Sequence, residues 1–504
     1  MSLSRNFIAG LTNSVWSALL GLAVVPTYIR FLGIESYGLI GFFVTTQTLL
    51  QLLDMGLAPT INREVARCSA SGKLKEAGNL LHTLSVVYWS MALLIALLTA
   101  ALAPLIADHW IQAKQLTQDN VEHAVMLMGL VIACRWPIGL YQGALVGAQR
   151  LTVSSGINML MATIGSLGAI AILAFVSPTI QAFFIWQASV GIVYAATMRW
   201  AAWRVIGRSR ETKFDVNQLK SIWRFSAGMT GITLMGLVFS QMDKVLLSKF
   251  LSLGEFAHYM LATTIVSALY VLVGATYNTI YPRFSALIVG GNLEELGKLY
   301  RLSTRLLAIV LFPSAMILAV FAKDLVQIWT GNLGMAETVA PILAFLAIGS
   351  ALNGIMYIPH AMLLAFGMTK LPLIINGILM IVQLPLIVIL ALKYGALGGA
   401  LAWFTLHILY VLLGTWLTHK HVYIGLAKKW LFNDVGVPLG LSISGGLLAQ
   451  YLCQSGELST YVQLAIGAGI ALSVVVVSLL LTPQLRLYVI RHLGGKEAAN
   501  IRQI

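Results

Sequence analysis

Long apolar runs separated by short polar segments dominate the chain. Each run is about 20 residues or longer and lacks the strict alternation of a barrel strand, which predicts membrane-spanning helices. The sequence therefore predicts an all-α, polytopic membrane protein with about 14 transmembrane helices. We place the spans at residues 7–30, 37–58, 80–107, 122–147, 153–176, 180–203, 223–248, 256–281, 302–329, 338–366, 371–392, 396–418, 431–453 and 460–482.

One stretch of the chain occurs twice: residues 31–82 align without a gap with residues 250–301, 219 positions later. Internal repeats in an apolar chain are typical of transporters built from two related halves. Since six spans separate equivalent points, both copies have the same orientation, which predicts two pseudo-symmetric six-helix bundles. The clearest matches pair Gly72, Leu74, Glu76, Gly78 and Leu80 with Gly291, Leu293, Glu295, Gly297 and Leu299.

The repeat also predicts the domain organisation. We expect an N-terminal bundle over 1–204, a basic cytoplasmic linker over 205–222 and a C-terminal bundle over 223–420. Two additional helices and a cytoplasmic tail follow over 421–504. The amphipathic segments GKLKEAGNLL and GNLEELGKLY are expected to lie along the membrane surface, between the second and third span of each bundle.

Composition supports the membrane class, since 59% of the residues are hydrophobic and 10% are charged, against roughly 25% charged in soluble proteins. The net charge of +14 does not indicate nucleic-acid binding, because no stretch is long enough to form a soluble basic domain. Instead, 25 of the 32 Lys and Arg residues fall on the side of the N-terminus. The positive-inside rule then predicts that both termini are cytoplasmic.

The sequence contains no motif that indicates catalysis. GxxxxGK[ST], HExxH, CxxC and GxSxG are all absent, and the three cysteines have no metal-ligand spacing. We therefore expect no catalytic residue, no metal and no cofactor. No predicted outer loop is long enough to fold as a domain, which argues against a membrane glycosyltransferase, ligase or polymerase.

Ionisable residues inside the spans are the main functional candidates, because their burial in a membrane is costly. Arg135 lies near the middle of the fourth span, where it should face a wet cavity or form an ion pair with an acid such as Asp54. Asp54 in the second span and Asp243 in the seventh are candidates for ion coupling. Asp243 is followed by Lys244, but adjacent helical residues point about 100° apart, so the two need not pair.

Further cations lie at span ends and are candidates for binding a substrate. Arg63 and Arg283 occupy nearly equivalent inner positions in the two bundles, where two guanidiniums could clamp a phosphate; ordinary inside-positive anchoring explains them equally well. Arg30 and Lys249 form a similar pair at outer ends. The predicted substrate-binding set is Arg30, Arg63, Arg135, Lys244, Lys249 and Arg283.

The fourth span also contains Pro137, which permits a bend. Gly139, Gly143 and Gly147 follow at a spacing of four residues. We interpret this stripe as a surface for helix packing.

Several segments give the chain a family resemblance. They are LGIESYGLIGFF, DMGLAPTINREVAR, QMDKVLLSKFLSLGEFAHY, YPRFSALIVGGNLEELGKLYR and YGALGGALAWF. With these segments the chain resembles bacterial O-antigen and oligosaccharide-lipid flippases of the multidrug/oligosaccharidyl-lipid/polysaccharide exporter superfamily. The resemblance implies two six-helix bundles facing a cationic cavity.

The resemblance also implies a function, namely export of a polyprenyl-pyrophosphate-linked oligosaccharide by alternating access, for O-antigen or other surface polysaccharide synthesis. The partners would be this lipid-linked sugar, membrane lipids, a proton or sodium ion and polysaccharide polymerase machinery, with no nucleic acid. Two extra spans resemble those of lipid II flippases, which keeps a lipid II-type substrate open. The chain could also be a cation antiporter of the same superfamily, or a non-transporting scaffold.

Overall fold

The computed structural model describes residues 3–54, 56–72, 77–207, 214, 234–423, 425–453 and 458–482. Within these ranges the regular elements are helices, and the one β-type contact is an isolated bridge between Gln112 and Ser252. This confirms the all-α class. Most of the predicted linker over 205–222, the start of the predicted seventh span and the tail after 482 lie outside the described residues.

The described residues contain 11 helices long and apolar enough to cross a membrane, or up to 12 if one bent pair forms a single span. This tally counts α15 (Lys370–His421) once, although its 52 residues would measure about 78 Å at 1.5 Å per residue. A bilayer core is only about 30 Å thick, and Gly395 interrupts the helix with φ 59° and ψ −137°. The two arms correspond to the predicted spans 371–392 and 396–418. The total of fourteen stays a prediction.

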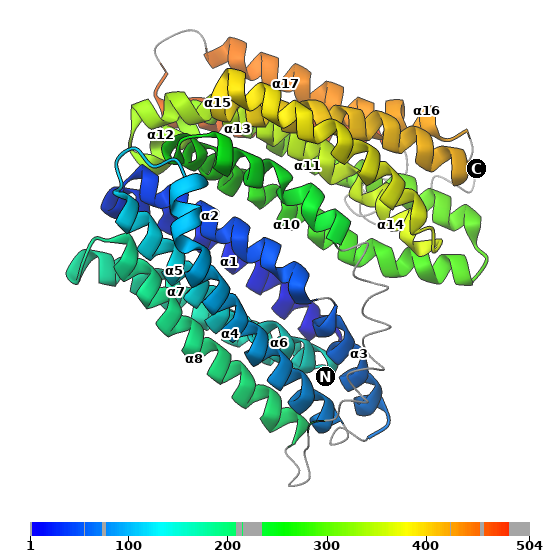
Figure 1. Ribbon diagram of the computed structural model, residues 1–504. Coiled ribbons are helices and arrows are strands. Elements are labelled where there is room, and N and C mark those ends of the chain that lie inside the picture. The colour runs from blue at the N-terminus through cyan, green and yellow to red at the C-terminus, as the bar shows by residue number, and fades with distance from the viewer. Residues whose placement is uncertain are drawn as a thin grey trace, which may run out of the picture. The chain divides into compact units, whose positions relative to one another are not determined.

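The chain divides into two compact units, whose helices are labelled in Figure 1 and coloured there by residue number. The first unit covers residues 1–264 and 384–399. It contains a helix over residues 234–250, the start of α10 (Leu253–Val289) and the elements α1 (Leu3–Leu32), α2 (Ile34–Leu50), η1 (Gln51–Asp54), α3 (Leu57–Ala70), α4 (Ala77–His109), α5 (Gln118–Arg135), α6 (Ile138–Gly147), α7 (Leu151–Phe175) and α8 (Ile180–Ile206).

The second unit covers residues 265–383 and 400–504. It contains the rest of α10, both outer portions of α15 and the elements α11 (Leu293–Val320), α12 (Ala322–Thr330), α13 (Leu333–Ile355), α14 (Tyr357–Ala365), α16 (Ala427–Lys429), η3 (Trp430–Gly436), α17 (Val437–Cys453) and α18 (Thr460–Leu480). The domain boundaries predicted at 204, 222 and 420 are not tested by this division.

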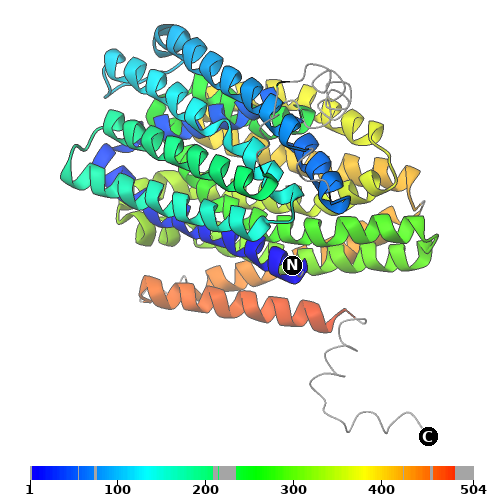
Figure 2. The ribbon, with the colours of Figure 1, turned by 90° about the horizontal axis from the view of Figure 1, so that it is seen from below.

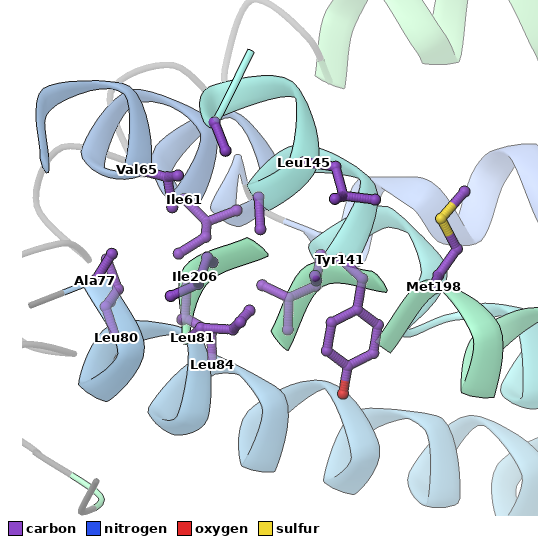
Figure 3. Close-up of a cluster of buried hydrophobic side chains, with 14 of the residues drawn as sticks. Ile61, Val65, Ala77, Leu80, Leu81, Leu84, Tyr141, Leu145, Met198 and Ile206 are labelled. Carbon is purple, nitrogen blue, oxygen red and sulfur yellow. The ribbon is translucent and has the colours of Figure 1, made fainter. Parts of the chain in front are cut away.

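The first unit has a dry core where α3, α4, α6 and α8 meet (Figure 3). Its fully buried side chains include Ile61, Leu81 and Tyr141. Two glycines of the predicted stripe permit the close approach of α6 to α3. A Cβ atom on Gly143 would lie 2.7 Å from the Ala58 carbonyl oxygen, and one on Gly147 would lie 2.4 Å from that of Asn62.

The repeat is visible in the helix boundaries. The α2–η1–α3 segment spans residues 34–70, and α10 spans 253–289, which is the same interval 219 positions later. Likewise α7 begins at Leu151 and α15 at Lys370. The copies differ in one respect: the first is bent by 54° where η1 ends, whereas α10 is continuous.

Packing in the second unit joins the last two helices to α11 through glycines. A Cβ atom on Gly446 of α17 would lie 2.6 Å from the Met316 side chain, and one on Gly467 of α18 would lie 2.3 Å from the Phe321 ring. Figure 2 shows α18 beside α17. These contacts leave α17 and α18 firmly attached to the second unit.

The prediction that GNLEELGKLY lies along the membrane surface is wrong. After Asn292, whose side chain accepts a hydrogen bond from the Glu295 N–H at 3.2 Å, the segment continues into α11 without interruption. Its residues therefore form the first turns of α11 and not a separate helix along the surface. In the first copy, residues 73–76 lie outside the described part of the chain.

Candidate functional site

A cavity of about 870 Å³ lies within the first unit, in the size range of small-molecule sites. Of the eight predicted site residues, Arg135 and Asp54 line it. Most of the other polar groups are neutral. The polar lining comprises Asn13, Ser17, Tyr28, Tyr37, Gln47, Gln51, Asp54, Tyr88, Arg135, Trp136, Gln142, Asn158, Ser166, Gln187, Tyr194 and Thr264.

Arg135 reaches this cavity from the last residue of α5. Pro137 has no N–H to continue the helix, so the chain breaks before α6 begins at Ile138. The carbonyl-rich end of α5 favours a cation there. Gly191 of α8 leaves room for the side chain, because a Cβ atom on it would lie 3.3 Å from Arg135 Cγ.

The Arg135 guanidinium is held on one side only. Nη2 donates to Gln187 Oε1 at 2.5 Å, and the Phe43 ring centroid lies 5.9 Å from Cζ. Gln187 is itself fixed, since its Nε2 donates to the Gly165 carbonyl oxygen at 3.3 Å. Nε of Arg135 is buried without a hydrogen-bond partner, so the guanidinium has donor capacity left for an anionic ligand.

Asp54 does not form an ion pair with Arg135. One carboxylate oxygen accepts a hydrogen bond from the Tyr88 hydroxyl, and the other accepts one from the Ala58 N–H at 3.2 Å. The carboxylate lies at the end of η1, beside the bend, and Gly56 takes the left-handed φ of 75° that the turn requires. The cavity thus holds one cation and one anion, each with separate neutral partners.

Tyrosines and amides form most of the remaining polar lining. Tyr194 donates to Asn158 Oδ1 at 2.5 Å, and Tyr28 donates to the Ser166 carbonyl oxygen at 3.1 Å. Groups of this kind can exchange hydrogen bonds with a hydroxylated ligand. The chemistry suits a ligand that combines an anionic group with many hydroxyls.

The other predicted cations lie elsewhere. Arg30 is exposed in the last turn of α1. Arg63 is 57% exposed and contacts Glu64 at 3.4 Å, and Arg283 is 65% exposed and contacts Glu295 at 3.6 Å. Both guanidiniums are accessible.

Lys249, Lys244 and Asp243 belong to the helix over 234–250. Lys249 donates to the His109 carbonyl oxygen, with its ammonium 5.5 Å from the centroid of the Trp110 ring. Lys244 does pair with Asp243, at 3.2 Å, because the long side chain folds back along the helix. Asp243 is buried and also accepts a hydrogen bond from Tyr259 at 2.6 Å. Each of the three groups therefore has at least one partner within the first unit.

Glu35 is a buried acid that our sequence reasoning missed. Its carboxylate accepts hydrogen bonds from three successive N–H groups, of Lys114 at 2.9 Å, Gln115 at 2.8 Å and Leu116 at 3.0 Å. Its position in the sequence does not indicate burial, since Glu35 lies just before the predicted second span. It fixes the loop between α4 and α5.

That loop in turn contacts the start of the second repeat copy. The Gln112 carbonyl oxygen accepts a hydrogen bond from the Leu253 N–H at 2.8 Å, and Trp110 donates to Ser248 Oγ at 3.1 Å. Directly beside this contact, a Cβ atom on Gly38 of α2 would lie 2.5 Å from the Leu253 carbonyl oxygen. The two repeat copies are therefore closely packed at this end of the first unit.

The second unit has a ladder of four tyrosines on α10 and α14. Tyr277 stacks on Tyr281 with centroids 5.8 Å apart and an angle of 5°, and meets Tyr357 edge-on at 6.0 Å. Tyr270 extends the ladder and donates to Asn353 Oδ1 at 3.0 Å. All four rings are partly exposed.

Comparison with known proteins shows a family match and similar relatives. The family described as "Polysaccharide biosynthesis protein" matches residues 3–288, more than half of the chain. A putative O-antigen transporter from Shigella flexneri is 23% identical over 424 residues, which cover 80% of this chain and 96% of that protein.

Two solved structures are similar in fold. The lipid II flippase MurJ in an inward closed conformation gives a TM-score of 0.70 at 15% identity, covering 95% of this chain and 98% of that one. An inward-facing MATE family transporter of the MOP superfamily gives a TM-score of 0.62 at 14% identity, covering 82% and 96%.

Proposed function

Because the chain belongs to the polysaccharide biosynthesis protein family and is similar to a putative O-antigen transporter, we propose that it moves a polyprenyl-pyrophosphate-linked oligosaccharide across a bacterial inner membrane. The head group would pass from the cytoplasmic to the outer leaflet by alternating access, while the prenyl tail stays in lipid. Both chain termini would be cytoplasmic. The product would serve O-antigen or other surface polysaccharide synthesis.

The observation that carries this proposal is the half-satisfied Arg135 guanidinium in a cavity of neutral hydrogen-bonding groups. A buried pyrophosphate without counter-charges would be prohibitively costly. Arg135 supplies a counter-charge with a planar fork that fits phosphate oxygens. The amides and tyrosine hydroxyls that surround it offer partners for sugar hydroxyls.

The exposed cations contribute at an earlier step in this proposal. Arg63 in the middle of α3 and Arg283 in the last two turns of α10 are accessible, and they would meet the pyrophosphate before it reaches Arg135. The tyrosine ladder of the second unit would stack on sugar rings, which have apolar faces.

Arg135 is tested by export in cells at matched protein level. Arg135→Gln keeps much of the volume and one donor pair but removes the charge, and we expect export to fall by at least tenfold. Arg135→Lys should retain intermediate activity. Arg204 provides a matched control, because its guanidinium lies 5.1 Å over the Trp200 ring outside the cavity; Arg204→Gln should export normally.

The substrate class is tested in the same cells by analysing lipid-linked sugars. Depletion of the protein, or Arg135→Gln, should cause a polyprenyl-pyrophosphate-linked oligosaccharide to accumulate in the inner leaflet. Accumulation of lipid II would support a lipid II-type substrate instead. If no lipid-linked sugar accumulates on depletion, the flippase proposal is wrong.

Asp54 is the proposed coupling residue, with the proton as its ion. Both carboxylate oxygens face hydrogen-bond donors, Tyr88 and the Ala58 N–H, rather than the several oxygen ligands that a metal cation requires. Asp54→Asn should fold and bind substrate but lose stimulation by a proton gradient in proteoliposomes. Stimulation by a sodium gradient at constant pH would contradict this assignment. Asp243→Asn serves as the comparison.

A further inference from the structure

A carboxylate in the second unit is completely buried between two arginines. Asp434 lies in the π-helix η3 and has no exposed surface. Arg301 donates two hydrogen bonds to it, from Nε to Oδ2 at 2.7 Å and from Nη2 to Oδ1 at 3.0 Å. Arg305, one turn further along α11, donates from Nη2 to Oδ1 at 2.6 Å. The π-helical turn is a feature often found at functional sites.

The charges of this trio do not balance. Two guanidiniums face one carboxylate, and in the described part of the chain neither arginine has another acid within ion-pair distance. The acids at the start of α11 have their own partners, Lys298 for Glu294 and Arg283 for Glu295. One positive charge is left over, on side chains that are 33% and 16% exposed.

Both arginines also keep unused donors. Nη1 of Arg301 and Nε and Nη1 of Arg305 have no hydrogen-bond partner among the described residues, and none of these atoms is buried. The Asp434 carboxylate therefore orients two forks whose remaining N–H groups point away from it. Such a preformed pair matches the oxygens of a phosphate.

The position along the chain places this pair at the level of lipid head groups. In α11 charged residues recur up to Arg305, and residues 306–320 are then uncharged and mostly apolar. The partner segment shows the same boundary, since Lys428 and Lys429 precede a largely apolar stretch. Aromatic residues, typical of the membrane interface, surround the trio: Trp430 donates to Thr304 Oγ1 at 3.0 Å and stacks on Tyr300.

A purely structural role explains only part of this arrangement. One Asp434–Arg301 pair would suffice to hold η3 against α11. A second, largely covered guanidinium adds desolvation cost and electrostatic repulsion without adding a counter-charge. An anion bound from outside would remove this imbalance, and at a membrane surface lipid phosphates are the abundant anions.

We propose that Arg301 and Arg305, oriented by Asp434, form a binding site for the phosphate of an anionic membrane phospholipid. The site would hold a lipid against the contact between α11 and the last two helices. It does not rest on the transport function, and it uses none of the residues that line the cavity of the first unit.

The test is a lipid titration of the full-length purified protein, followed by native mass spectrometry. The probes are phosphatidylglycerol, phosphatidylcholine and inorganic phosphate. We compare the wild type with the triple variant Arg301→Gln, Arg305→Gln, Asp434→Asn, which leaves no uncompensated buried charge. Lys420→Gln is the matched control: it removes one cation of the same unit, whose ammonium lies 5.4 Å over the Trp416 ring.

We expect the triple variant to bind phosphatidylglycerol roughly tenfold more weakly, as the loss of hydrogen bonds between charged groups predicts, and Lys420→Gln to bind as the wild type does. Equal binding by the triple variant and the wild type would overturn the proposal, as would equal weakening in Lys420→Gln. Displacement of the lipid by millimolar inorganic phosphate would identify free phosphate as the ligand instead.

A second variant keeps the test decisive if the triple variant does not fold. Arg305→Lys retains the charge and one bond to Asp434 but loses the fork. We expect it to melt within a few degrees of the wild type and still bind phosphatidylglycerol several-fold more weakly. Unchanged lipid binding by this folded variant would reject the phosphate site.

Discussion

Glu35 offers a sharp test of the contact between the α4–α5 loop and the second repeat copy. The carboxylate is 5% exposed and accepts three backbone N–H groups at 2.8–3.0 Å. In Glu35→Ala these donors lose their acceptor. A buried donor left without a partner costs about 1–3 kcal/mol, but water can reach part of a surface loop. We therefore expect a total loss of roughly 2–4 kcal/mol.

Hydrogen exchange followed by mass spectrometry measures this locally. If the loop opens more easily by that amount, the amides of residues 114–116 should exchange roughly 30- to 700-fold faster, because each 1.4 kcal/mol is a factor of ten. Glu35→Gln keeps one acceptor and should give an intermediate increase. Global stability should fall in the same order.

The control is Glu337→Gln, which removes a carboxylate that is 58% exposed and pairs with Lys323 at 2.8 Å. An exposed ion pair of this kind contributes about 0–1 kcal/mol, so exchange and melting should barely change. Unaltered exchange of residues 114–116 in Glu35→Ala would show that the carboxylate does not hold the loop.

Three further predictions concern other parts of the molecule. Gly147→Ala should lower the free energy of unfolding by roughly 1–3 kcal/mol, because the added Cβ meets the α3 backbone. Gly139→Ala is the control: its Cβ would meet nothing within 4 Å, so the melting temperature should stay unchanged. Trp430→Phe should cost about 1 kcal/mol in urea unfolding through loss of the bond to Thr304. Tyr277→Ala should reduce export several-fold while Tyr277→Phe retains it; equal export by both would remove the ladder from sugar recognition.

The sequence predicted the fold class and the repeat well, because both depend on patterns of apolar length and polar spacing. It also placed Arg135 and Asp54 among the functional candidates, and both line the cavity. The rule that identified them concerns ionisable residues inside spans. Applied to the predicted span 431–453, it would also have identified Asp434, which we overlooked.

The neutral hydrogen-bond partners of these two charged residues could not be predicted from the sequence. Gln187 and Tyr88 decide how Arg135 and Asp54 are held, yet amides and tyrosines are too common in apolar helices to be distinguished by type. Pairing was also uncertain from helical geometry alone. The angle between neighbouring positions suggested that Asp243 and Lys244 could remain apart, but the flexible lysine side chain folds back and reaches the carboxylate.

The second repeat copy has no charged residues at the positions equivalent to Arg135 and Asp54. Positions 219 residues after Arg135 and Asp54 are Gly354 and Val273, and in the second unit these two pack together. A Cβ atom on Gly354 would lie 2.8 Å from Val273 Cγ2, so no room exists there for a side chain comparable to arginine. Because α10 continues where the first copy bends, the second copy is closed at the point where the first opens into a cavity. Related helices thus share a scaffold, but in the described part of the chain the bend, the space beside it and the charges equivalent to Arg135 and Asp54 belong to the first copy.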